Sequence, residues 1–222
     1  RGEHKARVQH VVDQMKERPE GKRLSIRKTN SHSHTPHSKA FKKHTHQVNV
    51  SSLCNVLEVN EEELIAVAEG GCTIESLVNA TFPGGFLPQV VPEIRDFTLA
   101  GLVNGLGIET SSHLYGGFVE TVCAIEVVLA DGRVVLCSEE EESELFFALQ
   151  GAYGTLGVVT GVAVRLMRAK PFVRNEYILF RSLSAYGKAI REAIASDEHS
   201  FVEGFVFSRT EAVLLLSRFS DE

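Results

Sequence analysis

The sequence predicts an α+β fold in which many short strands accompany a few helices. Runs of aliphatic and β-branched residues recur along the chain and are separated by Gly, Pro, Asn and Asp, which is typical of strands and turns. Apolar residues at helical spacing occur in only a few segments. Strands and helices do not alternate regularly, so a parallel sheet built from βαβ units is not expected.

The N-terminal segment is predicted to be a helix followed by an extended chain. Residues 3–18 place four apolar side chains on one helical face, namely Val8, Val11, Val12 and Met15. Pro19 and Gly21 end this helix, and residues 24–27 form a short strand. Residues 28–46 are rich in His, Ser and Thr and too polar for a core, so we predict a loop there.

The middle of the chain is predicted to combine short strands with two capped helices. The strands are expected at residues 48–50, 56–59 and 64–68. Thr73 is expected to cap a helix that reaches about Ala80, and Thr98 is expected to cap a second helix that runs through Val103.

The second half of the chain begins with the clearest hairpin signal. Two apolar runs within residues 122–137 flank Asp131-Gly132, a dipeptide that favours a tight turn. A helix is expected at residues 143–150 and a buried strand at residues 157–167. A further α+β unit follows, with strands at residues 173–180, 201–207 and 212–217 and a helix at 183–195.

The composition is that of a soluble globular protein, with 43% hydrophobic and 23% charged residues. A net charge of −6 argues against nucleic acid as the main partner. The four cysteines form no C-x-x-C pair, so neither a zinc site nor a disulfide framework is expected, and no metal ligands are assigned. No apolar run reaches transmembrane length, and no signal peptide is visible. Because the chain begins with Arg1 and not with Met, we expect a fragment.

The stretch at residues 98–117 is the strongest functional signal in the sequence. It contains five glycines, Gly101, Gly105, Gly107, Gly116 and Gly117. Between them lie the polar residues Thr110, Ser111, Ser112 and His113. Glycine lets the backbone approach a ligand closely, while clustered N–H groups and hydroxyls neutralise a diphosphate. The stretch therefore predicts a site for an extended, phosphate-bearing cofactor.

The glycine spacing fits neither of two familiar phosphate motifs. Gly101, Gly105 and Gly107 do not form G-x-G-x-x-G, and no Gly-Lys-Ser/Thr follows as in a Walker A loop. The glycines also lie near mid-chain, whereas a Rossmann fold places them after its first strand. The alternative is that this stretch only packs a helix against a loop, and both interpretations stay open.

Several motifs in a fixed order carry a family resemblance. They are IETSSHLYG at 108–116, VLADG at 128–132, GTLG at 154–157 and FVEG at 201–204. From about Leu24 to Glu222 the chain resembles the FAD-binding domain of the vanillyl-alcohol-oxidase, or p-cresol methylhydroxylase, type. Within that superfamily it is most similar to the delta-24 sterol reductase (diminuto) family.

The resemblance implies an α+β fold with two lobes that clasp FAD in an extended conformation. Residues 1–23 would be an N-terminal helix and linker, and residues 24–170 the FAD-binding domain, with lobes at about 24–80 and 81–170. Residues 171–222 would begin a C-terminal substrate or cap region.

The resemblance also implies which residues hold the cofactor. Residues 28–33 would form the first phosphate loop. The other cofactor-binding residues would be Thr98, Gly101, Gly105, Gly107, Ile108, Glu109, Thr110, Ser111, Ser112, His113, Gly116, Gly157 and Val158. No catalytic residue is assigned.

The implied reaction is the reduction of a sterol side-chain double bond. NADPH would donate hydride to the flavin of FAD, which passes it to the alkene. The substrate would be a sterol or another small lipid, and the full-length protein would lie at the cytoplasmic face of the endoplasmic reticulum membrane. Two alternatives stay open: an FAD-dependent oxidase of the same fold that oxidises an alcohol with oxygen as acceptor, and a catalytically silent FAD-fold binding module.

Three histidines carry further hypotheses. A covalent bond from His32 or His34 to the flavin is one of them, although a solvated loop is the favoured interpretation. His113 either hydrogen-bonds a ribityl hydroxyl or the flavin edge, or is a structural histidine satisfied by nearby backbone.

Overall fold

The N-terminal helix packs on the body of the protein. The structure, a computed structural model, describes residues 2–28 and 39–222, with side chains in the second range described from Lys42 onward. The first element is α1 (Gly2–Lys16), whose four predicted apolar residues are at most 5% exposed. They pack in one cluster with Val48, Val128 and Val158, which confirms the predicted helix.

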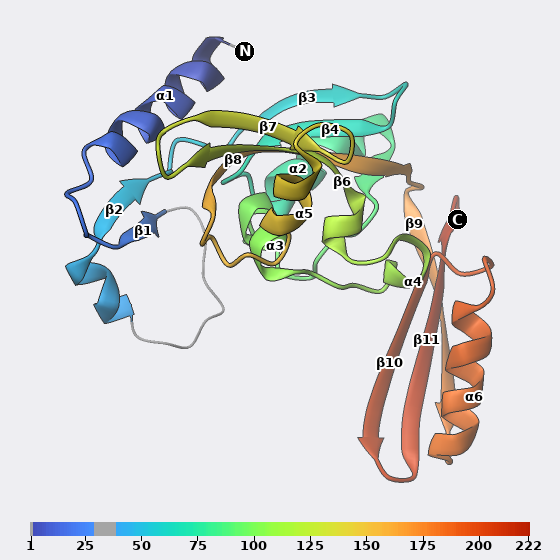
Figure 1. Cartoon of the computed structure of the whole chain (residues 1–222). Coiled ribbons are helices and arrows are strands. Elements are labelled where there is room, and N and C mark those ends of the chain that lie inside the picture. Colours follow the sequence, from blue (N-terminus) through green and yellow to red (C-terminus); the bar gives the residue numbers. More distant parts are fainter. Residues whose placement is uncertain (1, 29–38) are drawn as a thin grey trace.

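A small parallel sheet follows α1 (Figure 1). It consists of β1 (Leu24–Arg27) and β2 (His46–Asn49). A 3-10 helix, η1 (Lys39–His44), lies inside the segment that the sequence predicts as a loop. The Nζ of Lys42 donates a hydrogen bond to the carbonyl oxygen of Ile26 at 2.7 Å, which ties η1 to β1.

A six-stranded antiparallel sheet forms the centre of the molecule (Figure 1). Its strands are β3 (Val56–Asn60), β4 (Ile65–Glu69), β5 (Phe86–Pro88), β6 (Val122–Leu129), β7 (Val134–Ser138) and β8 (Gly157–Arg168). Their order is β3-β4-β8-β6-β7, and β5 pairs with the end of β8. The sheet therefore joins strands from both sides of residue 80, and the division into lobes at that residue stays a prediction.

The hairpin predicted around Asp131-Gly132 is present. β6 and β7 pair antiparallel on either side of these residues. Gly132 has a φ of 84°, a left-handed conformation that favours glycine. The Oδ1 of Asp131 accepts a hydrogen bond from the N–H of Arg133 at 3.0 Å, so local turn chemistry holds this connection.

Three helices lie together beneath the sheet in Figure 1, namely α2 (Ile74–Thr81), α3 (Leu99–Gly105) and α5 (Ser143–Leu149). Thr73 and Thr98 cap α2 and α3 as predicted. The Oγ1 of Thr73 accepts the N–H of Ser76 at 3.1 Å, and that of Thr98 accepts the N–H of Gly101 at 3.3 Å. The core between helices and sheet includes the fully buried side chains of Leu77, Leu99, Phe118, Phe146 and Leu149. Each such side chain contributes about 1.5–3 kcal/mol by leaving water.

The C-terminal part forms a separate antiparallel sheet covered by one helix (Figure 1). Its elements are β9 (Phe172–Phe180), α6 (Leu183–Ile194), β10 (Phe201–Ser208) and β11 (Glu211–Ser220), with the strands in the order β10-β11-β9. Tyr186 of α6 packs edge-on against Phe180 on one face of this sheet. The opposite face is open and apolar, with side chains 40–68% exposed at Tyr177, Leu179, Phe205 and Phe207.

Short helical turns complete the part of the chain that the structure describes. They are η2 (Phe82–Gly84), α4 (Ser112–Tyr115) and η3 (Phe118–Thr121). The glycine-rich stretch is thus partly helical at α4, where the sequence indicates only a loop. Among residues 2–28 and 39–222, no helix combines the length and the apolar character needed to cross a membrane.

Candidate functional site

A hollow opens where the end of β1, the turn after β4, the start of α3 and the start of β8 meet. Its lining residues are Ile26, Lys28, Val50, Gly70, Gly71, Thr98, Ala100, Gly101, Asn104, Tyr153, Gly154, Gly157, Val158 and Val159. Five segments that are distant in the sequence, including Val50 after β2, therefore build one concave surface, which is where small-molecule sites are usually found.

Gly70 and Gly71 form one corner of this hollow. A Cβ at Gly70 would overlap the carbonyl oxygen of Val159, and one at Gly71 would overlap that of Leu53. Only glycine lets these backbone segments approach so closely. The N–H of Gly70 donates to Thr160 O at 2.9 Å, which fixes the corner to β8.

The first turn of α3 lies beside this corner. Its N–H groups already have protein partners: Leu99 donates to Cys72 O at 3.0 Å, Ala100 to Gly70 O at 2.8 Å, and Gly101 to the Oγ1 of Thr98. These N–H groups therefore hold the hollow in shape. The positive charge at the site comes from Lys28, whose Nζ donates to the Oγ1 of Thr98 at 3.3 Å.

Asn104 joins α3 to the segment that precedes β8. Its Nδ2 donates to Ala100 O at 2.7 Å within the helix, and its Oδ1 accepts the N–H of Gly154 at 2.7 Å. The N–H of Tyr153 donates to the carbonyl oxygen of Asn104 at 3.1 Å. At Gly157, a Cβ would come within 2.7 Å of Val128 O, so this position also requires glycine.

A second hollow adjoins the first. The two share the wall formed by Tyr153, Gly154, Gly157 and Val158. The second is further lined by Met15, Arg18, Arg23, Leu24, Ala130, Thr155 and Leu156. Lys28 lines the first hollow, and Arg18 and Arg23 line the second, so each carries positive charge that suits a ligand with phosphate groups.

The structure divides the residues predicted to bind a cofactor into two groups. Thr98, Gly101, Gly157 and Val158 line the first hollow. The other nine lie along the chain that leads from α3 through α4 toward η3, namely Gly105, Gly107, Ile108, Glu109, Thr110, Ser111, Ser112, His113 and Gly116. Ile108 is 80% exposed there.

Polar groups of this second group are paired within the protein. The Oγ of Ser111 donates to Gln89 O at 2.7 Å, and the Oγ of Ser112 accepts the N–H of Glu109 at 2.8 Å. The carboxylate of Glu109 accepts the N–H of Glu93 at 3.0 Å. Burial and the charges of Glu93 and Glu203 nevertheless raise the pKa of Glu109 above its ordinary value of 4.5.

His113 connects this segment to the C-terminal sheet. Its Nδ1 lies 3.1 Å from Thr110 O, and its Nε2 lies 3.0 Å from the carbonyl oxygen of His199. The N–H of Val202, in β10, also donates to Thr110 O at 2.8 Å. Both ring nitrogens thus face backbone carbonyls. Of the two roles that the sequence leaves open for His113, this arrangement matches the structural one, in which nearby backbone satisfies the ring.

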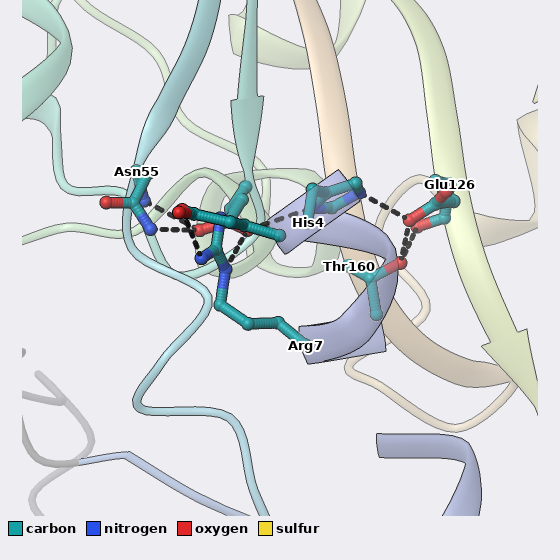
Figure 2. Close-up of polar contacts among 7 residues, drawn as sticks. His4, Arg7, Asn55, Glu126 and Thr160 are labelled. Carbon is teal, nitrogen blue, oxygen red and sulfur yellow. Dashed lines mark hydrogen bonds and ion pairs between the residues drawn. The ribbon is translucent and has the colours of Figure 1, made fainter. Parts of the chain in front are cut away.

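A partly buried charge network surrounds Glu69, the residue that directly precedes Gly70 in the sequence, and Figure 2 shows its polar contacts. Glu69 is 0% exposed, and its Oε2 accepts the N–H and the Nδ2–H of Asn55 at 2.9 and 2.7 Å. Its Oε1 faces the Nε of Arg7 at 2.7 Å and the Nδ1 of His4 at 2.8 Å. Burial alone would raise the pKa of Glu69, but the hydrogen bonds from His4, Asn55 and Arg7 hold it below 4.5.

The network continues across the sheet. The Nε2 of His4 lies 3.1 Å from the Oε1 of Glu126, in β6, and the Oγ1 of Thr160, in β8, donates to the same oxygen at 2.6 Å (Figure 2). Two residues of α1 therefore bind the carboxylate that immediately precedes the glycine corner of the hollow.

Sequence reasoning missed several lining residues. The dipeptide Gly70-Gly71 directly follows a predicted strand, and this was the available signal for a close backbone approach. Asn104 and Tyr153 carried no such signal, because their roles depend on a contact between α3 and the segment before β8. His32 and His34, proposed for a covalent flavin bond, lie outside the described residues.

Comparison with known proteins identifies the fold family. The sequence profile of a family described as FAD binding domain matches residues 2–138, more than half of the chain. The chain belongs to this FAD-binding domain family. The glycine corner and the basic side chains of Lys28, Arg18 and Arg23 suit the ligand that this family description names.

Curated relatives of this FAD-binding domain confirm the resemblance to sterol reductases. A Delta(24)-sterol reductase of Homo sapiens is 36% identical over 180 residues, which cover 81% of this chain and 35% of the relative. That of Arabidopsis thaliana is 34% identical over 184 residues, covering 79% of this chain and 33% of the relative. Cytokinin dehydrogenase 1 of Arabidopsis thaliana is 31% identical over 145 residues, covering 64% and 25%. The chain thus spans about a third of the length of the reductases it matches.

Proposed function

We propose that this chain is the FAD-holding part of an FAD-dependent oxidoreductase that reduces a sterol side-chain double bond with hydride from NADPH. The observation that carries the proposal is the pair of adjoining hollows, each lined by glycines and by basic side chains, in an FAD-binding domain. The 34–36% identity to proteins named Delta(24)-sterol reductase supports the choice of substrate.

The chain's own residues would position the dinucleotide. Lys28 of the first hollow, and Arg18 and Arg23 of the second, would offset the negative charge of the diphosphate. Gly70 and Gly157 would let the backbone lie close to the ligand, and Thr98 would contribute a hydroxyl. When bound, FAD would supply the two-electron chemistry of hydride transfer.

The remaining residues predicted from the resemblance are proposed to act at the far end of the site. The stretch from Gly105 to Gly116 runs toward β10, so it would line the passage between the cofactor and the C-terminal sheet. In this proposal the fold is the two-lobed p-cresol methylhydroxylase type, with its FAD-binding domain at residues 24–170 and the substrate region beginning at residue 171.

An apolar substrate is consistent with the open face of the C-terminal sheet. Tyr177, Leu179 and Phe205 are 40–68% exposed on that face. A sterol buries mainly hydrocarbon surface, so it would gain stability from contact with such side chains. The proposal also includes action at the endoplasmic reticulum membrane, in line with a lipid substrate.

The decisive experiment is the anaerobic visible spectrum of the protein reconstituted with FAD, recorded before and after the addition of NADPH. Flavin absorption that appears on reconstitution and bleaches with NADPH supports the reductase. Absence of bound flavin after reconstitution contradicts the proposal and favours a silent FAD-fold module.

A second candidate is an FAD-dependent oxidase of the same fold that removes hydride from an alcohol. The 31% identity to Cytokinin dehydrogenase 1, whose name denotes an oxidative reaction, favours this direction of electron flow. Bound flavin that resists NADPH, bleaches with an alcohol and recovers its colour in air would identify the oxidase.

A further inference from the structure

Tyr153 stands in the wall shared by the two hollows. It lines both of them, and its side chain is 81% exposed. An aromatic ring left this open loses the stabilisation that burial gives to aromatic side chains in a core. The ring is therefore available to a ligand that occupies either hollow.

The backbone of Tyr153 is strained. Its φ is +52°, in the left-handed region that L-residues other than glycine rarely adopt. Gly151 and Gly154, with φ of 74° and 73°, already supply the flexible points of this turn. A glycine at residue 153 would make the same turn without strain, so the tyrosine ring serves something other than the turn. Strained residues of this kind cluster at ligand clamps.

The backbone that carries the ring is held by α3. The N–H of Tyr153 donates to Asn104 O at 3.1 Å, and the N–H of the next residue, Gly154, donates to the Oδ1 of Asn104 at 2.7 Å. Because two hydrogen bonds hold the chain on either side of the Tyr153 Cα, only the side chain of Tyr153 remains to be ordered when a ligand arrives.

We propose that Tyr153 stacks its ring on a planar heteroaromatic ring of the dinucleotide bound across the two hollows. This inference rests on the proposed binding of FAD. FAD carries two such rings, adenine and isoalloxazine, and stacking of either on an aromatic side chain is favourable and independent of hydrogen-bond pattern. Arg18 and Arg23 in the second hollow would accommodate the phosphates that join the two halves.

The test measures FAD affinity and apo-protein stability in the same variants. Tyr153→Phe keeps the ring, so its FAD dissociation constant should stay within about two-fold of wild type. Tyr153→Gly removes the ring and relieves the strained φ. We expect it to weaken FAD binding about ten-fold while the melting temperature of the apo-protein stays equal or rises.

Opposite changes in affinity and stability separate a ligand contact from a structural role. If Tyr153→Gly binds FAD as wild type does, or loses stability in parallel with affinity, the stacking proposal is wrong. Phe172→Ala, which removes an aromatic ring 58% exposed at the start of β9, is the control and should bind FAD normally. If the wild-type chain itself binds no FAD, the proposed function fails together with this inference.

Binding of two fragments of FAD shows which of its rings, adenine or isoalloxazine, stacks on Tyr153. ADP contains only the adenine end, and FMN only the isoalloxazine end. A ten-fold loss in Tyr153→Gly with ADP alone places adenine on Tyr153, and a loss with FMN alone places isoalloxazine there. Equal binding of wild type and variant to both fragments overturns the proposal.

Discussion

The imidazole of His4 lies 2.8 Å from the carboxylate of Glu69, a residue 65 positions further along the chain (Figure 2). Its other nitrogen faces Glu126 at 3.1 Å. Ionised carboxylates only accept hydrogen bonds, and which ring nitrogen of His4 donates depends on its tautomer. Since Glu69 directly precedes Gly70, the N-terminal helix is joined to the corner of the candidate site by a buried charge network.

The first prediction concerns the charge of Glu69. Glu69→Gln keeps the size of the side chain but removes the charge that faces Arg7 and His4. We expect the free energy of unfolding at neutral pH to fall by about 1–3 kcal/mol, because buried donors to a carboxylate lose their ionic partner. Urea unfolding monitored by circular dichroism measures this change.

The pH dependence of the same variant gives a second readout. The pKa of Glu69 is lowered in the folded protein, so its stabilising contribution is complete above 4.5 and is lost as the pH falls through the folded-state value. Part of the acid destabilisation of the wild type should therefore be missing in Glu69→Gln. Glu3→Gln is the control, because Glu3 is 92% exposed and its 3.5 Å contact with Arg7 contributes less than about 1 kcal/mol. An unchanged acid slope in Glu69→Gln would contradict the assignment.

The next prediction compares two glycines. Gly70→Ala should lower stability by about 1–3 kcal/mol, because its Cβ overlaps the backbone oxygen of Val159 and forces β4 and β8 apart. Gly105→Ala is the matched control, since no atom lies within 4 Å of its Cβ. As a residue of α3, Gly105 should tolerate alanine or gain up to about 1 kcal/mol. Thermal unfolding of both variants measures the contrast, and equal melting temperatures would refute it.

Local sequence signals predicted most elements of this fold. The hairpin at Asp131-Gly132 and the caps at Thr73 and Thr98 follow from a few neighbouring residues, and the structure confirms them. The 3-10 helix η1 departs from the predicted loop because Lys42 binds the carbonyl of Ile26 in β1, a partner that local composition does not reveal.

The candidate site was less accessible to sequence reasoning. Its corner depends on the contact between Gly70 and Val159, and its shared wall depends on the hydrogen bond between Asn104 and Tyr153. Both contacts join segments that are far apart in the sequence. The sequence predicts the whole glycine-rich stretch at residues 98–117 to be one cofactor site. In the structure only its first part lines the hollow, while Ser111 and His113 bind backbone carbonyls of other segments.

A third prediction tests the hollow through Gly101. Its Cβ would lie 3.0 Å from the Oγ1 of Thr98, the atom that also receives Lys28. Gly101→Val should therefore crowd the hollow and reduce FAD retained after gel filtration by at least about ten-fold. Gly187→Val, in α6 outside the site, where a Cβ would meet only the Arg191 side chain at 3.5 Å, should retain FAD. Normal flavin content in Gly101→Val would remove Gly101 from the site.

A fourth prediction follows from the raised pKa of Glu109. Burial and the charges of Glu93 and Glu203 disfavour its ionised form in the folded protein. Stability is therefore lost as the pH rises from 4.5 through the raised pKa of Glu109. Glu109→Gln removes this penalty and still offers an oxygen to the N–H of Glu93, so its melting temperature at neutral pH should exceed that of the wild type. Glu93→Gln, at an exposed residue whose backbone N–H keeps its bond to Glu109, serves as comparison. A lower melting temperature for Glu109→Gln would show that the carboxylate stabilises the fold.

The fifth prediction concerns the link between the glycine-rich stretch and the C-terminal sheet. His113→Ala removes the ring contacts to Thr110 O and His199 O, while the N–H of Val202 keeps its own bond to Thr110 O. Losing a hydrogen bond of about 1 kcal/mol should speed hydrogen exchange at the Val202 amide by roughly five-fold. The matched control is His199→Ala: His113 binds the backbone oxygen of that residue and not its ring, so exchange at Val202 should stay as in the wild type. If both variants exchange at the wild-type rate, His113 does not secure the C-terminal sheet.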